Sequence, residues 1–434
     1  MSKRLFVLLS VLVAASMMLA ACGGTPAPVE TSAPASSASS SAPAAFQCTD
    51  KIGCVDIAPG DPIHIAFWGV LSGADAALGD DSKRGVELAI DAQGKLLDHD
   101  IQLTSEDALC TPEGGATAAT KLAADTSIVA LVGSSCSDET VGGIATLTKA
   151  GLTTISMSNT RPALTDPNRS PDYAGYLRTA YSDAFQGSAV ADFAYNTLKV
   201  TKVATIHDGS AYAQALVGVF VDSFQKLGGT ITDQEAVAKT DTDMRPVLTK
   251  IAATGPEAIY FPTFVAAGGY ICAQMHSVPG LEKAAMLSSD GVASTDFLKA
   301  CGPQVVGLYD SGPDFTQFPS TYKDLVAKYQ AKYGQSPTSI YHGQAYDAAG
   351  IIFAAIQKVA VVDADGTVHI GRQALRDAIY ATTDYQGVTG TLSCNASGDC
   401  GSHAIAVYQV ANADLWDLTN ATNPNPKKVW PTTP

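Results

Sequence analysis

Positively charged residues are scarce in this sequence. Its 434 residues include 27 lysines and arginines against 42 aspartates and glutamates, which gives a formal net charge of −15. Because binding to a phosphate backbone requires a basic face, this balance argues against a nucleic-acid partner. The same balance gives the chain no electrostatic attraction to an anionic bilayer.

Long apolar runs and enzyme motifs are also missing. After residue 21 no apolar run reaches about 18 residues, so we expect no transmembrane helix in the rest of the chain. There is no G-x-G-x-x-G after a strand, no P-loop and no G-x-S-x-G turn. Neither C-x-x-C nor H-E-x-x-H spacing occurs, so we expect no metal and no other cofactor. These absences argue against an enzyme.

The first residues are typical of a secretory signal peptide, which we place at residues 1–21. Lys3 and Arg4 precede an apolar run from Leu5 to Ala21 that only two serines interrupt. The run ends in Leu-Ala-Ala-Cys22, which resembles the lipobox of bacterial lipoproteins. The resemblance implies cleavage before Cys22 and a lipid on its sulfur, which would hold the protein at the membrane. An ordinary signal peptide that leaves Cys22 just inside the mature chain is the alternative.

Residues 22–45 are expected to form a disordered tether. They consist almost entirely of glycine, serine, alanine, threonine and proline, which bury too little apolar surface to offset the entropy of ordering. Removal of Lys3 and Arg4 with the signal would change the formal charge from −15 to −17. Together these segments predict an extracytoplasmic protein, tethered to the cell membrane by lipid.

The sequence has nine cysteines, and setting Cys22 aside for lipid leaves eight. An even number in an exported protein is typical of disulfides. The eight are Cys48, Cys54, Cys110, Cys136, Cys272, Cys301, Cys394 and Cys400. The first two lie close together in sequence, as do the last two, so each of these pairs could close a small loop. Spacing leaves the other pairings open.

From Ile63 onward, short β-rich runs alternate with helix-length amphipathic stretches, which is typical of parallel sheets wrapped by helices. We expect strands at 63–68, 101–105, 128–132 and 153–156, and helices over 81–94, 112–125 and 138–150. A second series follows. It has a helix over 184–198, strands at 202–207, 230–236, 258–261, 285–288 and 305–309, and helices over 320–333 and 342–359.

Nearly four hundred residues follow the tether, which exceeds one core, so we predict two doubly wound α/β lobes. A connection after Pro313 returns the chain to the first lobe in this interpretation. We therefore assign 62–182 and 313–402 to lobe 1, 183–312 and 403–418 to lobe 2, and 419–434 to a C-terminal tail.

Several loops resemble those of the leucine/isoleucine/valine-binding proteins, type I periplasmic receptors of branched-chain amino acid ABC transporters. The resemblance runs from about Ile63 to Val410. Its segments are Gly69–Gly73 with Leu78-Gly79, Glu106–Pro112, Val132–Ser137, Arg178–Ala180 with Gln186-Gly187, and Ile206–Asp208 with Tyr212. It implies two Rossmann-like lobes joined by a three-segment hinge, which close around an amino acid and deliver it to the permease subunits. It also implies a disulfide between Cys110 and Cys136.

The resemblance assigns ligand contacts to nine positions of this sequence. They are Leu78, Ser135, Ser137, Ser158, Thr160, Tyr212, Phe264, Asp290 and Tyr341. It implies that Ser137 binds the ligand carboxylate and that Asp290 pairs with the ligand α-ammonium. The backbone carbonyl of Ser158 would meet the ammonium as well. The alternatives are a plain helix N-cap for Ser137 and a turn aspartate for Asp290.

The sequence departs from the family pattern at Leu78, Met157, Asn159, Arg161 and Phe264. Leu78 and Phe264 replace tyrosines found in other members, which leaves a mostly apolar pocket. An aliphatic or small neutral amino acid fits that pocket best. Because Arg161 and Asp138 lie just outside the pocket, a charged amino acid is the alternative ligand. A sensory or surface-interaction module on the same fold remains the alternative function.

Overall fold

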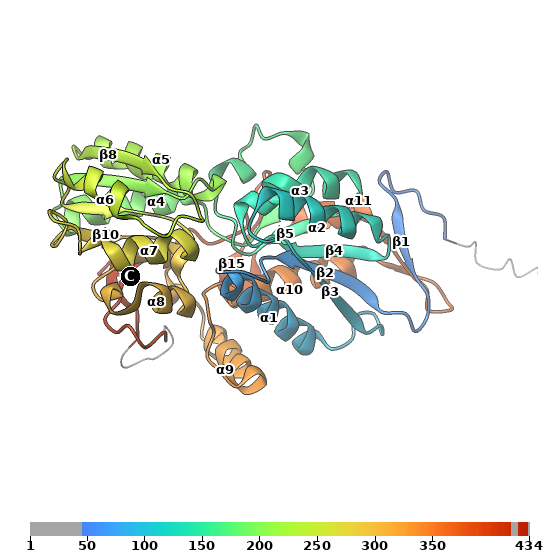
Figure 1. Cartoon of the computed structure of the whole chain (residues 1–434). Helices are drawn as coiled ribbons and strands as arrows, with labels where there is room; N and C mark the ends of the chain where they lie inside the picture. Colours follow the sequence, from blue (N-terminus) through green and yellow to red (C-terminus); the bar gives the residue numbers. More distant parts are fainter. Residues whose placement is uncertain (1–45, 418–423, 433–434) are drawn as a thin grey trace, which may run out of the picture. The chain divides into compact units, whose positions relative to one another are not determined.

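The computed structural model describes residues 46–417 and 424–432. The predicted signal peptide, Cys22 and the tether lie outside the described residues. The described chain is built on two large β-sheets, each accompanied by helices (Figure 1). Within residues 46–417 and 424–432, no helix is long and apolar enough to cross a membrane.

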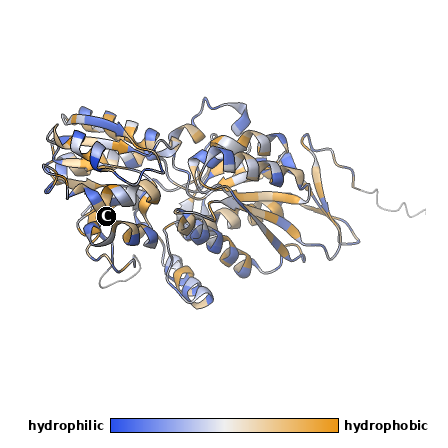
Figure 2. Ribbon diagram, viewed as in Figure 1, coloured by the Kyte–Doolittle hydropathy of each residue, from blue (hydrophilic) through white to orange (hydrophobic). Residues whose placement is uncertain are grey.

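The first sheet has five parallel strands in the order β3-β2-β4-β5-β6. Its strands are β2 Ile63–Gly69, β3 Ile101–Asp107, β4 Ile128–Gly133, β5 Thr154–Ser156 and β6 Tyr176–Arg178. Every residue of β2 and β4 is buried, as expected of central parallel strands covered on both faces. Figure 2 shows apolar residues concentrated on the strands and polar residues on the outer faces of the helices.

Helices pack in pairs around this first sheet. They are α1 Ala76–Gln93, α2 Pro112–Ala124, α3 Ser137–Lys149, α10 His342–Val359 and α11 Arg372–Tyr380. Helix α1 packs on α10, and α2 packs on α3. Outside these layers lie α9 Thr321–Tyr333, a small sheet of β1 Cys54–Ile57, β12 Val361–Val362 and β13 Val368–Gly371, and a hairpin of β14 Tyr385–Gly387 and β15 Gly390–Leu392.

The second sheet has seven strands in the order β17-β16-β11-β10-β9-β7-β8. They are β7 Lys202–His207, β8 Thr230–Ala236, β9 Ala258–Tyr260, β10 Ala285–Leu287, β11 Tyr309–Pro313, β16 Ile405–Gln409 and β17 Lys427–Trp430. The five strands from β7 to β11 are parallel, and the last two run antiparallel at one edge. Its helices are α4 Asp183–Asp192, α5 Ala211–Lys226, α6 Arg245–Ala252, α7 Val265–Met275 and α8 Thr295–Cys301.

The chain passes between the two sheets three times: after β6, after β11 and before β16. The predicted fold class is confirmed: two doubly wound α/β lobes are joined by three segments. The parallel strands of both lobes follow the same order, with the first strand of each between its second and third. Ligands of such sheets bind beyond the carboxyl ends of the strands, where the order reverses. That position lies beyond β2 and β4 in one lobe, and beyond β7 and β9 in the other.

All eight described cysteines are bonded in pairs in the structure. The pairs are Cys48 with Cys54, Cys110 with Cys136, Cys272 with Cys301, and Cys394 with Cys400. Sequence spacing had left the Cys272 and Cys301 pairing open. The pair at Cys110 and Cys136 joins the loops that follow β3 and β4, at the edge of the first sheet where a ligand is expected.

Some sequence expectations need correction. The strand expected at 305–309 begins only at Tyr309, because Gly307 has a φ of 94°, which is incompatible with a strand. The helix expected from Asp81 begins at Ala76. The helix expected over 184–198 becomes a π-helical turn at Phe193–Thr197. Part of the expected tail is β17, which pairs with β16 and extends the second sheet.

Arg178, at the end of β6, is fully buried and holds the loop after β5. Its Nη1 donates to the carbonyls of Asn159 (3.3 Å) and Arg161 (3.0 Å). Its Nη2 donates to Asp399 Oδ2 at 2.6 Å, in the loop closed by Cys394 and Cys400. One buried cation thus fixes two distant segments beside the hinge.

We predict that Asp399→Asn lowers the free energy of unfolding by about 3–5 kcal/mol, because it leaves the buried charge of Arg178 without its counter-charge. Asp296→Asn, which removes the partner of the exposed Lys299, is the matched control and should cost about 0–1 kcal/mol. Urea unfolding measures both. Equal effects of the two substitutions would show that Arg178 does not depend on Asp399.

Candidate functional site

Asp290 lies at the centre of a buried cluster of polar side chains. It follows β10 and is 5 % exposed. Its Oδ1 accepts hydrogen bonds from Gln186 Nε2 (2.7 Å) and the Tyr212 hydroxyl (2.9 Å), and its Oδ2 accepts one from the Tyr341 hydroxyl (2.8 Å). The hydroxyls of Tyr341 and Tyr181 are 2.9 Å apart. None of these partners carries a positive charge.

Burial raises the pKa of Asp290 above its usual range, although hydrogen bonds from Gln186, Tyr341 and Tyr212 act in the opposite direction. A carboxylate that is buried without a cation is costly unless a positive charge arrives to pair with it. No neighbouring side chain that hydrogen-bonds to Asp290 compensates its charge.

Asp183 is a second buried carboxyl in this cluster, and sequence reasoning missed it. It is the first residue of α4, and both of its oxygens lack a hydrogen-bond partner. Burial, and then the charge of Asp290, raise its pKa well above the usual range. Its N–H donates to the Thr160 carbonyl at 2.8 Å, which places Thr160 beside it. The signal in the sequence was an aspartate that opens a helix three residues before Gln186.

Asp310 on β11 is a third fully buried carboxyl near Asp290, and its Oδ1 also lacks a partner. Burial and the charge of Asp290 raise its pKa well above the usual range. The positive charge of Arg178 lowers the pKa of Asp183, but Arg178 already forms an ion pair with Asp399.

Four predicted residues of the first lobe follow β4 and β5: Ser135, Ser137, Ser158 and Thr160. Ser158 Oγ donates to the Ser135 carbonyl at 2.7 Å, so these two predicted residues are in contact. Ser137 begins α3, and its hydroxyl makes no hydrogen bond to any residue of the described chain. The first N–H groups of a helix have no partner within the helix and favour anions. Ser137 thus combines a free hydroxyl with a helix N-terminus.

The carboxylate of Glu139 fixes the loop between β4 and α3 by hydrogen bonds. Its Oε2 accepts from the N–H groups of Ser135 (2.9 Å) and Cys136 (2.8 Å), and its Oε1 accepts from the N–H of Cys110 (2.8 Å). The side chain is fully buried, and burial raises its pKa to about 7. One carboxylate therefore joins both loops that the disulfide also links.

The remaining predicted residues form apolar walls around Asp290. The rings of Tyr212 and Phe264 are 5.1 Å apart, and Leu78 lines a cavity together with Asp290 and Val265. The volume of this cavity is about 10 Å³, which is on the order of one water molecule. A ligand as large as an amino acid can enter only when the tyrosines or the lobes move.

Comparison with known proteins identifies the architecture. The model of a family described as periplasmic binding protein matches residues 62–414. The chain belongs to the periplasmic binding protein family. The members of this family are solute-binding proteins, so this one is a binding protein and not an enzyme.

Curated relatives of this periplasmic binding protein cover most of its length. A Leu/Ile/Val-binding protein homolog from Brucella melitensis is 28% identical over 351 residues, which is 80% of this chain and 91% of the relative. An amino acid binding protein from Pseudomonas aeruginosa is 32% identical over 275 residues, 62% of this chain and 72% of the relative.

A solved structure shows the same fold. It is the branched-chain amino acid transporter substrate binding protein of Streptococcus pneumoniae, in complex with isoleucine. Its TM-score is 0.72 at 24% identity, over 81% of this chain and 97% of that one.

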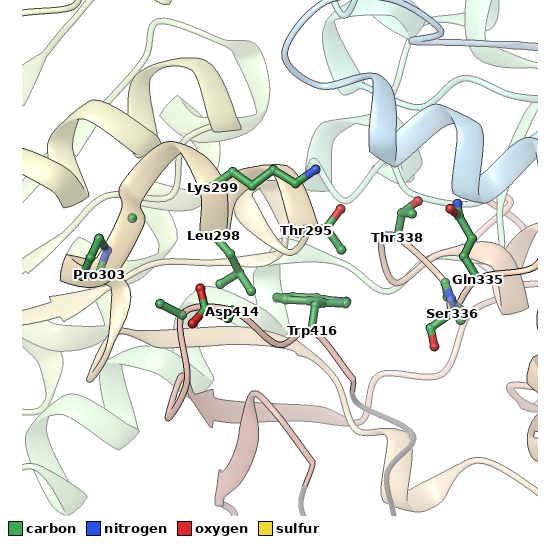
Figure 3. A pocket seen from close by; sticks show the side chains of 12 residues that line it. Thr295, Leu298, Lys299, Pro303, Gln335, Ser336, Thr338, Asp414 and Trp416 are labelled. Carbon is green, nitrogen blue, oxygen red and sulfur yellow. The ribbon is translucent and has the colours of Figure 1, made fainter.

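A larger hollow of this periplasmic binding protein lies elsewhere. Its volume is about 830 Å³, and none of the nine predicted ligand-contact residues lines it (Figure 3). It lies among α8, the 335–338 loop and the segment around Trp416. The convergence of buried, unpartnered polar atoms marks the smaller cavity at Asp290 as the better candidate. Among residues 46–417 and 424–432, no cluster of histidine, cysteine or acidic side chains could hold a metal ion.

We predict that Glu139→Gln destabilises the protein by about 1.5–3 kcal/mol, because the amide nitrogen cannot accept the N–H bonds that the carboxylate accepts. Urea unfolding with the disulfides intact measures the change. Glu113→Gln on the exposed start of α2 is the control and should leave stability within about 0.5 kcal/mol. If Glu139→Gln were as stable as this control, the carboxylate would not be what holds the two loops.

Proposed function

We propose that this protein captures an amino acid, branched-chain or another small neutral one, between its lobes and delivers it to the permease subunits of an ABC importer. The observation that supports this most is the buried carboxylate of Asp290, which has three hydrogen-bond donors and no cation. A ligand α-ammonium would supply the missing positive charge. A charge-assisted hydrogen bond of this kind contributes about 1.5–3 kcal/mol.

The proposed partner of the ligand carboxylate is the start of α3. The free hydroxyl of Ser137 and the N–H groups of that helix end are suited to an anion. Thr160 and Ser158 follow β5, the next strand in the sheet, and Thr160 Oγ1 is buried without a partner. Asp183 would share the ammonium with Asp290. The two charged ends of a zwitterion would thus each find a counterpart in this site.

The side chain of the ligand would meet the apolar walls at Leu78, Phe264, Tyr212 and Tyr341. We assign a branched-chain or small neutral amino acid on this ground. The names of the relatives agree, since one is a Leu/Ile/Val-binding protein homolog and another an amino acid binding protein.

We further propose that the protein is exported, oxidised to four disulfides and anchored by lipid on Cys22, with residues 22–45 as the tether. The support is the lipobox-like end of the apolar N-terminal run and the pairing of the eight remaining cysteines. Mass spectrometry of the mature N-terminus tests the anchor. An unmodified cysteine there would contradict it.

A ligand-sensing or surface-interaction module on the same fold is the alternative. Such a module would bind its ligand without associating with a permease. Co-purification of the liganded protein with permease subunits from its own membrane distinguishes the two functions.

For the unlipidated protein made with Cys22→Ala, we predict that at least one of the twenty amino acids raises the thermal midpoint. A ligand that binds only the folded state adds about 2.7 kcal/mol at one hundred times its Kd. Asp290→Ala should abolish this rise while leaving the protein folded, because the ammonium loses its counter-charge.

Asp296→Asn on the exposed face of α8 is the control and should respond to ligand as the unsubstituted protein does. Differential scanning calorimetry with the full amino-acid panel measures all three proteins. If no amino acid stabilises the unsubstituted protein, the amino-acid assignment is wrong. If Asp290→Ala keeps the full response, the assignment of the ammonium site is wrong.

A further inference from the structure

An aspartate of the first lobe caps a helix of the second. Asp75 occupies the N-cap position of its own helix α1 but makes no capping hydrogen bond there. Its Oδ1 instead accepts from the N–H of Val265 at 3.0 Å, across a separation of 190 residues. Val265 is the first residue of α7, and the N-cap residue of that helix, Phe264, provides no side-chain cap. Asp75 therefore performs for α7 the role that a local cap would perform.

The same arrangement recurs at a second helix. Asp138, the second residue of α3, accepts from the N–H of Ala211 with both carboxylate oxygens, at 3.1 and 3.2 Å. Ala211 is the first residue of α5, the helix that also carries Tyr212. Both contacts place a negative group at the positive end of a helix, where a carboxylate is favoured.

A lysine of the second lobe reaches in the opposite direction. Lys239 Nζ donates to the Cys110 carbonyl at 2.9 Å, in the disulfide-braced loop of the first lobe. The same ammonium lies 4.8 Å from the centre of the Phe264 ring. The positive charge of Lys239 also lowers the pKa of both Asp75 and Asp138. The three side chains thus bridge the two lobes by separate hydrogen bonds.

We propose that Asp75, Asp138 and Lys239 form a closure latch, a set of positioning residues that hold the two lobes together and so set how slowly a captured ligand leaves. The inference rests on the proposed function, and it adds the residues that control release. The backbone hydrogen bonds of all three side chains join groups on different lobes, so none of these bonds can form while the lobes are apart. Loss of the latch should therefore accelerate ligand release much more than it slows ligand entry.

The contribution of the latch to lobe closure should depend on pH. Burial raises the pKa of Asp75 to about 6 and raises that of Asp138. The charged groups that face both carboxyls are Lys239, which favours their ionised forms, and Asp208, which opposes them. With the lobes apart, the carboxyl of Asp75 would titrate near its usual value of about 4.

Closure therefore takes up a proton between about pH 4 and pH 6, and its contribution is lost as the pH rises through 6. Asp75→Asn keeps an acceptor oxygen for Val265 but cannot titrate. The difference in ligand affinity between this variant and the unsubstituted protein should consequently change across that range and stay constant above it. A purely structural role for Asp75 would give no such profile.

The test uses the unlipidated full-length protein and isoleucine as the probe. Stopped-flow displacement measures the release rate for Asp75→Ala, Asp138→Ala and Lys239→Met, with Asp222→Asn on the exposed face of α5 as the control. We expect each latch variant to release isoleucine about tenfold faster or more, since each loses a hydrogen bond to a charged group. The far-UV circular dichroism of each variant without isoleucine should match that of the control, because both lobes stay folded. Release rates equal to that of Asp222→Asn would overturn the latch.

A ligand-independent measurement separates failure of the latch from failure of the proposed function. If neither isoleucine nor any other amino acid binds the unsubstituted protein, the proposed function fails. Small-angle X-ray scattering of the unliganded proteins then decides. The latch requires a larger radius of gyration for its variants than for the control, and equal radii would overturn it.

Discussion

The carboxylate of Asp290, buried between two lobes without a cation of its own, is the feature on which the rest of the site depends. Three neutral donors position it, and burial raises its pKa. Asp183 and Asp310 add two further buried carboxyls nearby, and burial together with the charge of Asp290 raises the pKa of each well above its usual range. Evolution of a stable core alone would favour apolar residues in these places. A ligand ammonium that paired with Asp290 would offset the free-energy cost of burying these carboxyls.

Helix N-termini provide the complementary half of the electrostatics. The start of α3 carries Ser137, the proposed partner of the ligand carboxylate, while Glu139 fixes the preceding loop by hydrogen bonds. The first N–H groups of α5 and α7 donate to Asp138 and Asp75 of the opposite lobe. Doubly wound sheets place such helix ends along one edge, so two lobes that face each other bring these ends together. The fold therefore supplies the helix ends on which both the proposed anion site and the proposed closure contacts depend.

The sequence predicts the order of strands and helices well, because buried parallel strands such as β4 are continuous apolar runs and α10 has a clear apolar stripe. The family resemblance singled out Asp290, which the structure buries among polar side chains; its contact with a ligand stays a prediction. The sequence could not place Asp75 and Asp138 as caps of α7 and α5, because their partners are 190 and 73 residues away. It missed Asp183 because an aspartate at a helix start is usually only a cap. The sequence also could not predict where β11 begins, because that depends on the positive φ of Gly307. It missed β17, because this strand forms only by pairing with β16.

The central claim is that a ligand ammonium binds at Asp290 between the lobes. A crystal structure of the unlipidated protein, grown with the amino acid that stabilises it most, tests this directly. The account predicts the ligand nitrogen within about 3 Å of the Asp290 carboxylate and the ligand carboxylate at the start of α3. A ligand bound in the larger hollow beside Trp416, or one whose ammonium makes no contact with Asp290, would contradict it.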